Sequence, residues 1–85
     1  MKTINTEKYI ENFCIIKEKN ILFTGDDEGQ LKEWKIIDNG KNLEFINNYQ
    51  IHSKWIKNTI RLNDDKIITC SNDKLIKIYK LKILN

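Results

Sequence analysis

The chain has 85 residues, contains no proline and carries a formal net charge of +3 at pH 7. A chain of this length forms about one small domain and buries roughly 60% of its unfolded surface, so a core that it builds alone is marginal. The basic side chains are almost all lysines, with Arg61 as the single arginine, and they lack the clustered Lys/Arg face that is typical of nucleic-acid binding.

Seven short stretches alternate with period two and are rich in Ile, Leu, Phe, Tyr and Thr, which is the pattern of β-strands. In chain order they cover residues 9–16, 21–25, 30–37, 43–49, 55–62, 66–70 and 75–81. Asn, Asp and Gly separate them, and Asn39-Gly40 is the best hairpin signal because both residues tolerate the positive φ of a type I′ turn. The sequence therefore predicts seven antiparallel strands joined by tight turns.

The second half of the chain repeats the first. Sliding the sequence against itself by 45 positions places Thr24 on Thr69 and Trp34 on Tyr79. The same shift aligns Ile15 with Ile60, Leu22 with Ile67, Leu31 with Ile76, Lys32 with Lys77 and Lys35 with Lys80. Because a fixed period indicates a repeat architecture, we expect one structural unit to be used twice.

The repeat resembles that of the WD-repeat (WD40) β-propeller family, whose units of about 40 to 45 residues form four-stranded blades. The first unit offers Thr24-Gly25-Asp26-Asp27-Glu28-Gly29 and then Trp34-Lys35; the second offers His52, Thr69-Cys70-Ser71-Asn72-Asp73 and Tyr79-Lys80. The resemblance implies an all-β fold of two adjacent antiparallel blades, a partial β-propeller. Its parts are an extension at 1–8, a first blade at 9–49, an incomplete second blade at 50–82 and a tail at 83–85.

The same resemblance implies a structural clasp in each unit. In the second unit Asp73 accepts a hydrogen bond from His52, and Thr69 connects His52 to the ring of Tyr79, although a phenol stands where the family has an indole. In the first unit Thr24 and Trp34 remain. Glu28 replaces the aspartate there and Glu7 stands at the histidine position, so we expect that clasp to be broken and Trp34 to serve mostly as packing surface.

Catalysis and metal binding find little support in the sequence. His52 has no companion nucleophile motif, and Cys14, His52 and Cys70 lack the spacing of a metal site, so the two cysteines are interpreted as small core residues. Leu31 and Ile37 stand where a calcium loop starting at Asp26 needs Gly and Glu. Gly25, Gly29 and Gly40 are assigned to turns, and no catalytic residue, metal or cofactor is predicted.

A contact patch is predicted on the rim of the two units. Trp55 follows His52 closely, and a large residue there often lies where partners of WD-repeat proteins dock. The proposed patch consists of Trp55, Ser53, Lys54, Asn72 and Asp27. The alternative, in which Trp55 packs against a neighbouring blade, stays open.

Two blades cannot close a propeller ring, so the remaining blades are expected from a longer parent chain or from self-association. The predicted function is that of a protein-interaction scaffold. The alternative is binding to nucleic acid or another acidic surface through Lys74, Lys77, Lys80 and Lys82, which are otherwise ordinary solvated strand residues. No leader or membrane-spanning run is seen, which predicts an intracellular protein in the cytoplasm or, alternatively, the nucleus.

Overall fold

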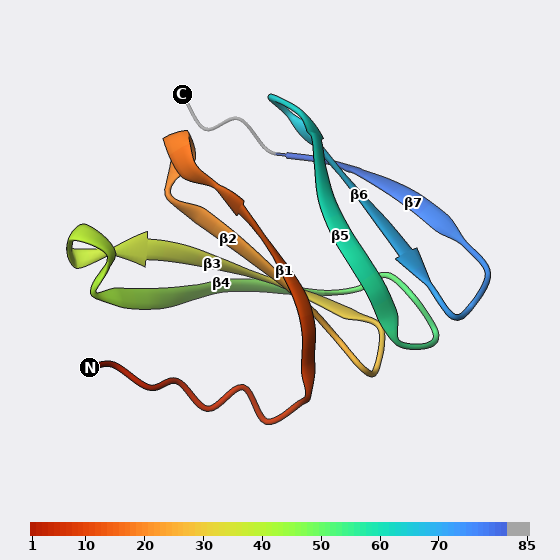
Figure 1. The fold of residues 1–85 in the computed structure, drawn as a ribbon, viewed down its shortest axis with the longest axis horizontal. Helices are drawn as coiled ribbons and strands as arrows, with labels where there is room; N and C mark the ends of the chain where they lie inside the picture. Colours follow the sequence, from red (N-terminus) through yellow and green to blue (C-terminus); the bar gives the residue numbers. More distant parts are fainter. Residues whose placement is uncertain (82–85) are drawn as a thin grey trace.

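The computed structural model describes residues 1–81, and this part of the chain is all-β (Figure 1). Its strands are β1 (Ile10–Ile16), β2 (Ile21–Asp26), β3 (Gln30–Ile37), β4 (Asn42–Gln50), β5 (Ile56–Asn63), β6 (Lys66–Ser71) and β7 (Ile76–Lys80). The only helical segments among these residues are two 3-10 turns, η1 (Lys17–Lys19) and η2 (Asp38–Gly40). The prediction of seven strands is confirmed, and each lies within a residue or so of its expected bounds.

The strands form two antiparallel sheets. The first sheet has the order β1-β2-β3-β4 and the second has the order β5-β6-β7. Every neighbouring pair is consecutive in the chain, so each sheet is a simple meander. The predicted tail at 83–85 and the last residue of the predicted second blade, position 82, lie outside the described residues.

The hairpin predicted at Asn39-Gly40 is present, but it is not a two-residue type I′ turn. Ile37 pairs with Asn42, so the loop contains residues 38 to 41. Asp38, Asn39 and Gly40 all have positive φ, at 53°, 57° and 83°. Aspartate and asparagine tolerate this region better than other residues with a Cβ, which explains how a longer left-handed loop replaces the expected turn.

The core lies between the two sheets, where β1 and β2 face β5 (Figure 1). Alternate residues of each strand point to this junction, as the period-two pattern requires. The buried apolar residues of this core are Cys14, Ile16, Phe23 and Leu31 from the first sheet, Ile56 and Ile67 from the second, and Leu81 beyond β7. Full burial of a side chain such as Phe23 contributes about 1.5 to 3 kcal/mol, so this small cluster supplies much of the apolar stabilisation.

A polar bridge crosses the junction beside this core. The side-chain amide of Asn12 donates to the carbonyl of Ile56 at 2.7 Å, and the hydroxyl of Thr59 donates to Oδ1 of Asn12 at 2.5 Å. Gly25 lies directly under this bridge, because a Cβ there would come within 2.7 Å of Oδ1 of Asn12 and 2.9 Å of a methyl group of Ile56. The assignment of Gly25 to a turn was therefore wrong: it lies inside β2 and permits the close approach of the second sheet.

The structure also corrects the alignment of the two units. β2 and β3 match β6 and β7 at the predicted spacing of 45 residues, but Phe13 pairs with Thr24 whereas Thr59 pairs with Thr69. β1 therefore matches β5 at a spacing of 46, and the structural counterpart of Ile15 is Arg61 rather than Ile60. The cause lies in the connection between the first two strands of each sheet. Its loop has four residues, 17–20, in the first sheet and two, 64–65, in the second, and a register shift between Arg61 and Asn63 leaves a net difference of one residue.

Candidate functional site

The imidazole of His52 joins the loop before β5 to the turn after β6. Its Nδ1 lies 2.9 Å from Oδ2 of Asp73, and its Nε2 lies 2.8 Å from Oγ1 of Thr69. His52 is 3% exposed and Thr69 is 1% exposed. In the neutral tautomer that satisfies every atom, Nδ1–H donates to the carboxylate and the Thr69 hydroxyl donates to Nε2. These three residues form what we call the clasp.

Asp73 is held by more than the imidazole. Its Oδ2 also accepts the backbone N–H of Ser53 at 3.1 Å, and its Oδ1 accepts that of Leu75 at 2.9 Å. Burial opposes ionisation of this carboxyl, but the hydrogen bonds from His52, Leu75 and Ser53 outweigh it and lower the pKa of Asp73. The carboxylate thus fixes both the turn to which it belongs and the loop that carries His52.

The link expected from Thr69 to Tyr79 is absent among the described contacts. The ring of Tyr79 instead packs against Phe23 at 5.9 Å and against Tyr49 at 5.1 Å between centroids, both from the first sheet. The physical reason is the chemistry of the ring: a phenol carries its donor at the tip, whereas an indole carries its N–H on the side. Burial raises the pKa of Tyr49, and so does the hydrogen bond that its hydroxyl donates to Glu33 at 2.9 Å.

The first sheet has the hydrogen bond between the threonine and the ring that is missing from the second sheet. The indole N–H of Trp34 donates to Oγ1 of Thr24 at 3.0 Å, and both residues are buried. The expectation that Trp34 serves mostly as packing surface was therefore incomplete, although the indole also stacks edge-on against Phe45 at 5.5 Å. Glu28, which stands at the position of Asp73, pairs with Lys8 at 2.5 Å, and Glu7 at the histidine position is exposed.

Asp26 organises the turn after β2. Its Oδ1 accepts the backbone N–H groups of Glu28 and Gln30, at 2.9 and 3.0 Å. Ser71, its counterpart in the second sheet, accepts the N–H of Asp73 in the same way at 3.1 Å. In both turns, therefore, a side-chain oxygen at the end of the strand accepts a backbone N–H two residues later, although the side chain is aspartate in one sheet and serine in the other.

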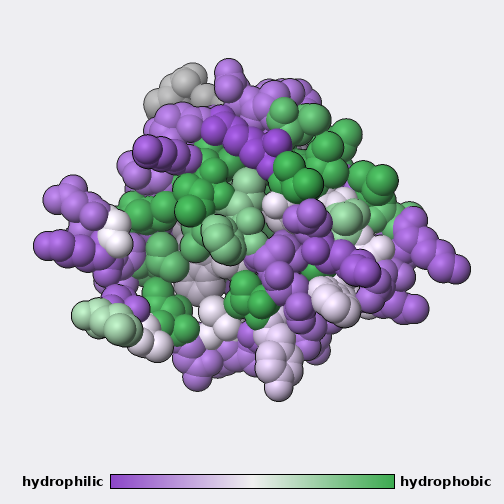
Figure 2. Space-filling view, viewed as in Figure 1, coloured by the Kyte–Doolittle hydropathy of each residue, from purple (hydrophilic) through white to green (hydrophobic). Residues whose placement is uncertain are grey.

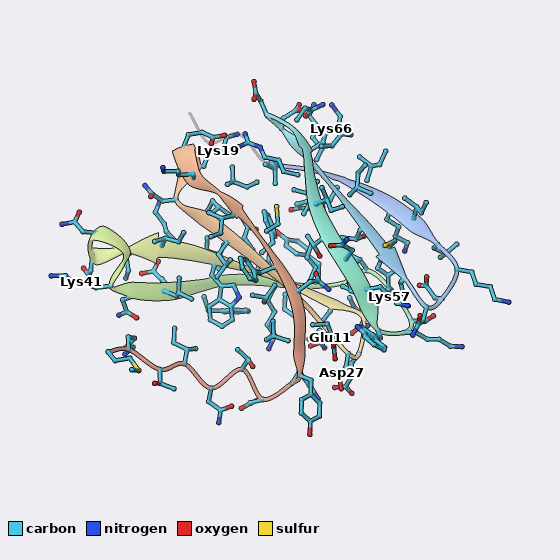
Figure 3. All side chains as sticks on the ribbon, in the orientation of Figure 1. Glu11, Lys19, Asp27, Lys41, Lys57 and Lys66 are labelled. Carbon is cyan, nitrogen blue, oxygen red and sulfur yellow. The ribbon has the colours of Figure 1, made fainter. Side chains whose placement is uncertain are left out.

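The five residues of the predicted contact patch are brought together at one end of the two sheets. Ser71 Oγ donates to the carbonyl of Lys54 at 3.1 Å, and the backbone N–H of Asn72 donates to the carbonyl of Trp55 at 3.1 Å. The turn that contains Asp27 touches the same loop, because a Cβ on Gly29 would lie 2.0 Å from the carbonyl oxygen of His52. Figure 3 shows Asp27 and Lys57 at this end of the molecule. We call Asp27, Ser53, Lys54, Trp55 and Asn72 the rim.

Trp55 lies on the surface of the rim. It is 38% exposed, and the ammonium group of Lys57 lies 5.6 Å from the ring centroid. Ser53, Lys54 and Asn72 are exposed as well, whereas Asp27 is partly buried. An indole held by a cation on one side and open to solvent on the other offers the amphipathic surface that protein interfaces favour.

Residues 1–81 contain no group of three His, Cys, Asp or Glu side chains placed to hold a metal ion. Within the same residues, no helix has the length and apolar character needed to cross a membrane. His52 is buried and engaged on both nitrogens, so the clasp offers a substrate neither a free base nor a nucleophile.

Sequence reasoning missed the polar contacts between the sheets. Asn12, Thr59 and Gly25 form the bridge described above, and Arg61 forms an ion pair with Glu18 in η1. The hydrogen bond from Arg61 lowers the pKa of Glu18 to about 2. The available signal was the solitary arginine, since a guanidinium makes the fork-shaped contact with a carboxylate that lysine cannot make.

Comparisons with known proteins place this chain beside segments of larger proteins. No protein-family model matches it. It is 29% identical over 66 residues to the WD repeat-containing protein 55 homolog of Dictyostelium discoideum, covering 78% of this chain and 15% of that protein. It is 28% identical over 83 residues to myosin heavy chain kinase C of the same organism, covering 95% of this chain and 10% of that protein.

A third similar protein is polyadenylation factor subunit 2 of Candida albicans, with 32% identity over 59 residues, 68% of this chain and 10% of that protein. The chain thus spans between a tenth and about a seventh of the length of these curated relatives. The similarity, weak as it is in identity, supports a relation to WD-repeat proteins, in agreement with the four-stranded and three-stranded antiparallel sheets.

Proposed function

We propose that this chain forms two WD-type blades, at 9–49 and 50–82, flanked by an extension at 1–8 and a tail at 83–85, and acts as a protein-interaction scaffold without catalysis. The observation that carries the proposal is the clasp. Because Asp73 accepts from both His52 and the N–H of Ser53, the loop that contains Lys54 and Trp55 is held against the turn of Asn72. A rigid rim presents side chains to a partner with little loss of conformational entropy on binding.

The relation to a WD repeat-containing protein supports this role, and the kinase in the name of another relative does not contradict it. This chain covers 10% of that kinase, so the name describes a much larger protein. The two cysteines of the described chain are unpaired, which supports our further proposal of a reducing intracellular compartment, cytoplasm or nucleus.

A comparison of captured proteins tests the rim. The immobilised chain is exposed to a cell extract alongside Trp55→Ala, Asn72→Lys and, as a matched surface control, Lys41→Glu from the distant loop at 38–41. We expect a set of proteins that the wild type and Lys41→Glu retain and that both rim variants lose. An unchanged set for both rim variants would remove the rim from the proposal.

Nucleic-acid binding is the competing outcome. Lys74, Lys77 and Lys80 are exposed, but Ile76 and Ile78 lie between them and no aromatic residue alternates with them on β7 before Tyr79. Fluorescence anisotropy with labelled single-stranded and double-stranded DNA and RNA measures whether the chain binds nucleic acid. An affinity that falls steeply with added salt and with Lys77→Glu would replace the scaffold role with an electrostatic one.

A further inference from the structure

Each sheet has one face that does not pack against the other sheet, and each of these faces carries a row of apolar residues. On the second sheet, paired residues form the row Ile60, Ile68 and Ile78, which we call the leading row. On the first sheet, paired residues form the row Ile15, Leu22, Trp34 and Phe45, which we call the trailing row. Figure 2 shows apolar surface over β1 and β2 and a second apolar area over β5 and β7.

The outer members of these rows are open to solvent, whereas Leu22 and Ile68 are partly buried and Trp34 is buried. Ile60 and Ile78 are 53% and 61% exposed, and Ile15 and Phe45 are 49% and 52% exposed. The N-terminal stretch contacts the first sheet through the carbonyl of Thr6, which accepts from the ammonium of Lys32 at 3.2 Å, and it leaves Ile15 and Phe45 exposed. Contiguous apolar surface of this kind marks a site of association.

The contact inside the chain shows how such rows fit together. The row Cys14, Phe23 and Glu33 of the first sheet occupies the position of the leading row. The row Arg61, Ile67 and Tyr79 of the second sheet occupies the position of the trailing row. These two rows meet in the core, where Phe23 contacts Tyr79 and both Phe23 and Ile67 are fully buried.

The free rows are more apolar than the rows that already pack. Where the buried pair carries Glu33 and Arg61, the leading row has Ile78 and the trailing row has Ile15. Asn58 stands at the position of Asn12, whose amide crosses the junction to a backbone carbonyl, so the same donor is available beside the leading row. The free faces therefore repeat the arrangement of rows that packs inside this chain, with fewer charges to desolvate. They differ from it at two positions, because Cys70 stands at the place of Gly25 and Phe13 stands at the place of Thr59.

We propose that a second copy of this chain docks head to tail, with the leading row of one copy packed against the trailing row of the next. The contact is heterologous, because it joins two different faces of the same molecule, and repetition closes a ring or extends a filament according to the rotation between copies. None of the residues in the two rows belongs to the rim, so substitutions in the rows test this contact separately from the proposed scaffold role.

The experiment uses the 85-residue chain and two substitutions at exposed positions, Ile78→Lys in the leading row and Ile15→Lys in the trailing row. Light scattering during size-exclusion chromatography gives the mass over a range of protein concentrations, and far-ultraviolet circular dichroism verifies that each variant is folded. Ile46→Lys is the matched control, because Ile46 is an exposed apolar residue of β4 that lies outside both rows. We expect an oligomer for the wild type and for Ile46→Lys, and monomers for each row variant alone.

Mixing the two row variants is the decisive measurement. Ile78→Lys retains an intact trailing row and Ile15→Lys retains an intact leading row, so an equal mixture should give a one-to-one dimer that grows no further. A wild type that stays monomeric at every concentration would overturn the proposal. So would an oligomer that both variants still form, or variants that fail to combine when mixed, since either result indicates a different contact.

The thiol of Cys70 provides an independent readout. It is partly exposed beside the leading row, paired with Asn58 and Ile76, whereas Cys14 is buried and its thiol pKa is raised by that burial. Alkylation of Cys70 should therefore be slow in the assembled wild type and fast in Ile78→Lys. Equal rates in the two proteins would contradict docking on this face.

Discussion

The conformation of the loop before β5 depends on the hydrogen bonds of His52. Its two ring nitrogens contact Asp73 and Thr69, and all three side chains are removed from water. A buried polar group that loses its partner costs about 1 to 3 kcal/mol, which exceeds the net gain of about 0.5 to 1.5 kcal/mol from a typical hydrogen bond. The clasp therefore fixes one loop conformation chiefly because every alternative leaves a buried group unpaired.

Replacement of His52 by alanine should expose that cost. We expect His52→Ala to lower the free energy of unfolding by about 1 to 3 kcal/mol, because Thr69 and Asp73 lose their shared partner. Urea denaturation followed by tryptophan fluorescence measures the change. Ser53→Ala, which alters an exposed neighbour without touching the clasp, serves as the control and should remain close to the wild type.

At the scale of elements, the strands were predictable because they depend on local pattern. Period-two alternation placed all seven, and the repeat with its resemblance to WD units indicated the contacts of His52 with Asp73 and Thr69. The spacing between the sheets was not predictable in the same way. It depends on Gly25 in one sheet and on Ile56 and Thr59 in the other, and no local pattern relates a glycine in a strand to residues so distant in sequence.

The orientation of the Tyr79 ring could not be predicted from local sequence pattern either. Its position in the repeat was clear, but its direction depends on Phe23 and Tyr49, which come from the other sheet and are invisible to a comparison of the two units. The shift of β1 against β5 was also hidden, because a connection that is one residue shorter overall leaves the hydrophobic alternation along most of each strand intact.

Gly25→Ala should disturb the contact between the sheets rather than either sheet alone. Its Cβ would press on Oδ1 of Asn12 and on a methyl group of Ile56, and overpacking of this kind typically costs about 1 to 3 kcal/mol. Thermal unfolding by circular dichroism reports the loss. The double variant with Asn12→Ala should recover part of it, and a Gly25→Ala protein as stable as the wild type would show that the sheets do not pack this closely.

At the scale of the whole molecule, stability rests on one small core and a few polar links. Asp73 has a lowered pKa, so its contribution to stability is present above the pKa of an unfolded aspartate, about 3.9, and is lost as the pH falls through the folded value. Glu18 and Asp65, which also have lowered pKa values, add to the same acid dependence.

Asp73→Asn separates this contribution from the others. The variant should be less stable than the wild type near neutral pH, and the difference should shrink as the pH is lowered below about 4, because protonation removes the same charge from the wild type. Denaturant titrations at several pH values measure it, with Asp38→Asn in the exposed loop as control. A difference that stays constant down to the most acidic pH would assign the effect of Asp73 to packing rather than to its charge.

The shorter hairpin loop of the second sheet has a bearing on protein engineering. Ile10 and Ile56 hold equivalent places in their sheets, although they are 46 residues apart and the rest of the pattern repeats at 45. If the β1-β2 hairpin replaced the β5-β6 hairpin at the 45-residue spacing of the sequence alignment, Ile10 would replace Trp55. The loop between His52 and the first strand of the second sheet would then be one residue shorter. A chimera of the two halves should therefore be joined according to strand pairing. At the start of β5 this places the junction one residue later than the sequence alignment does.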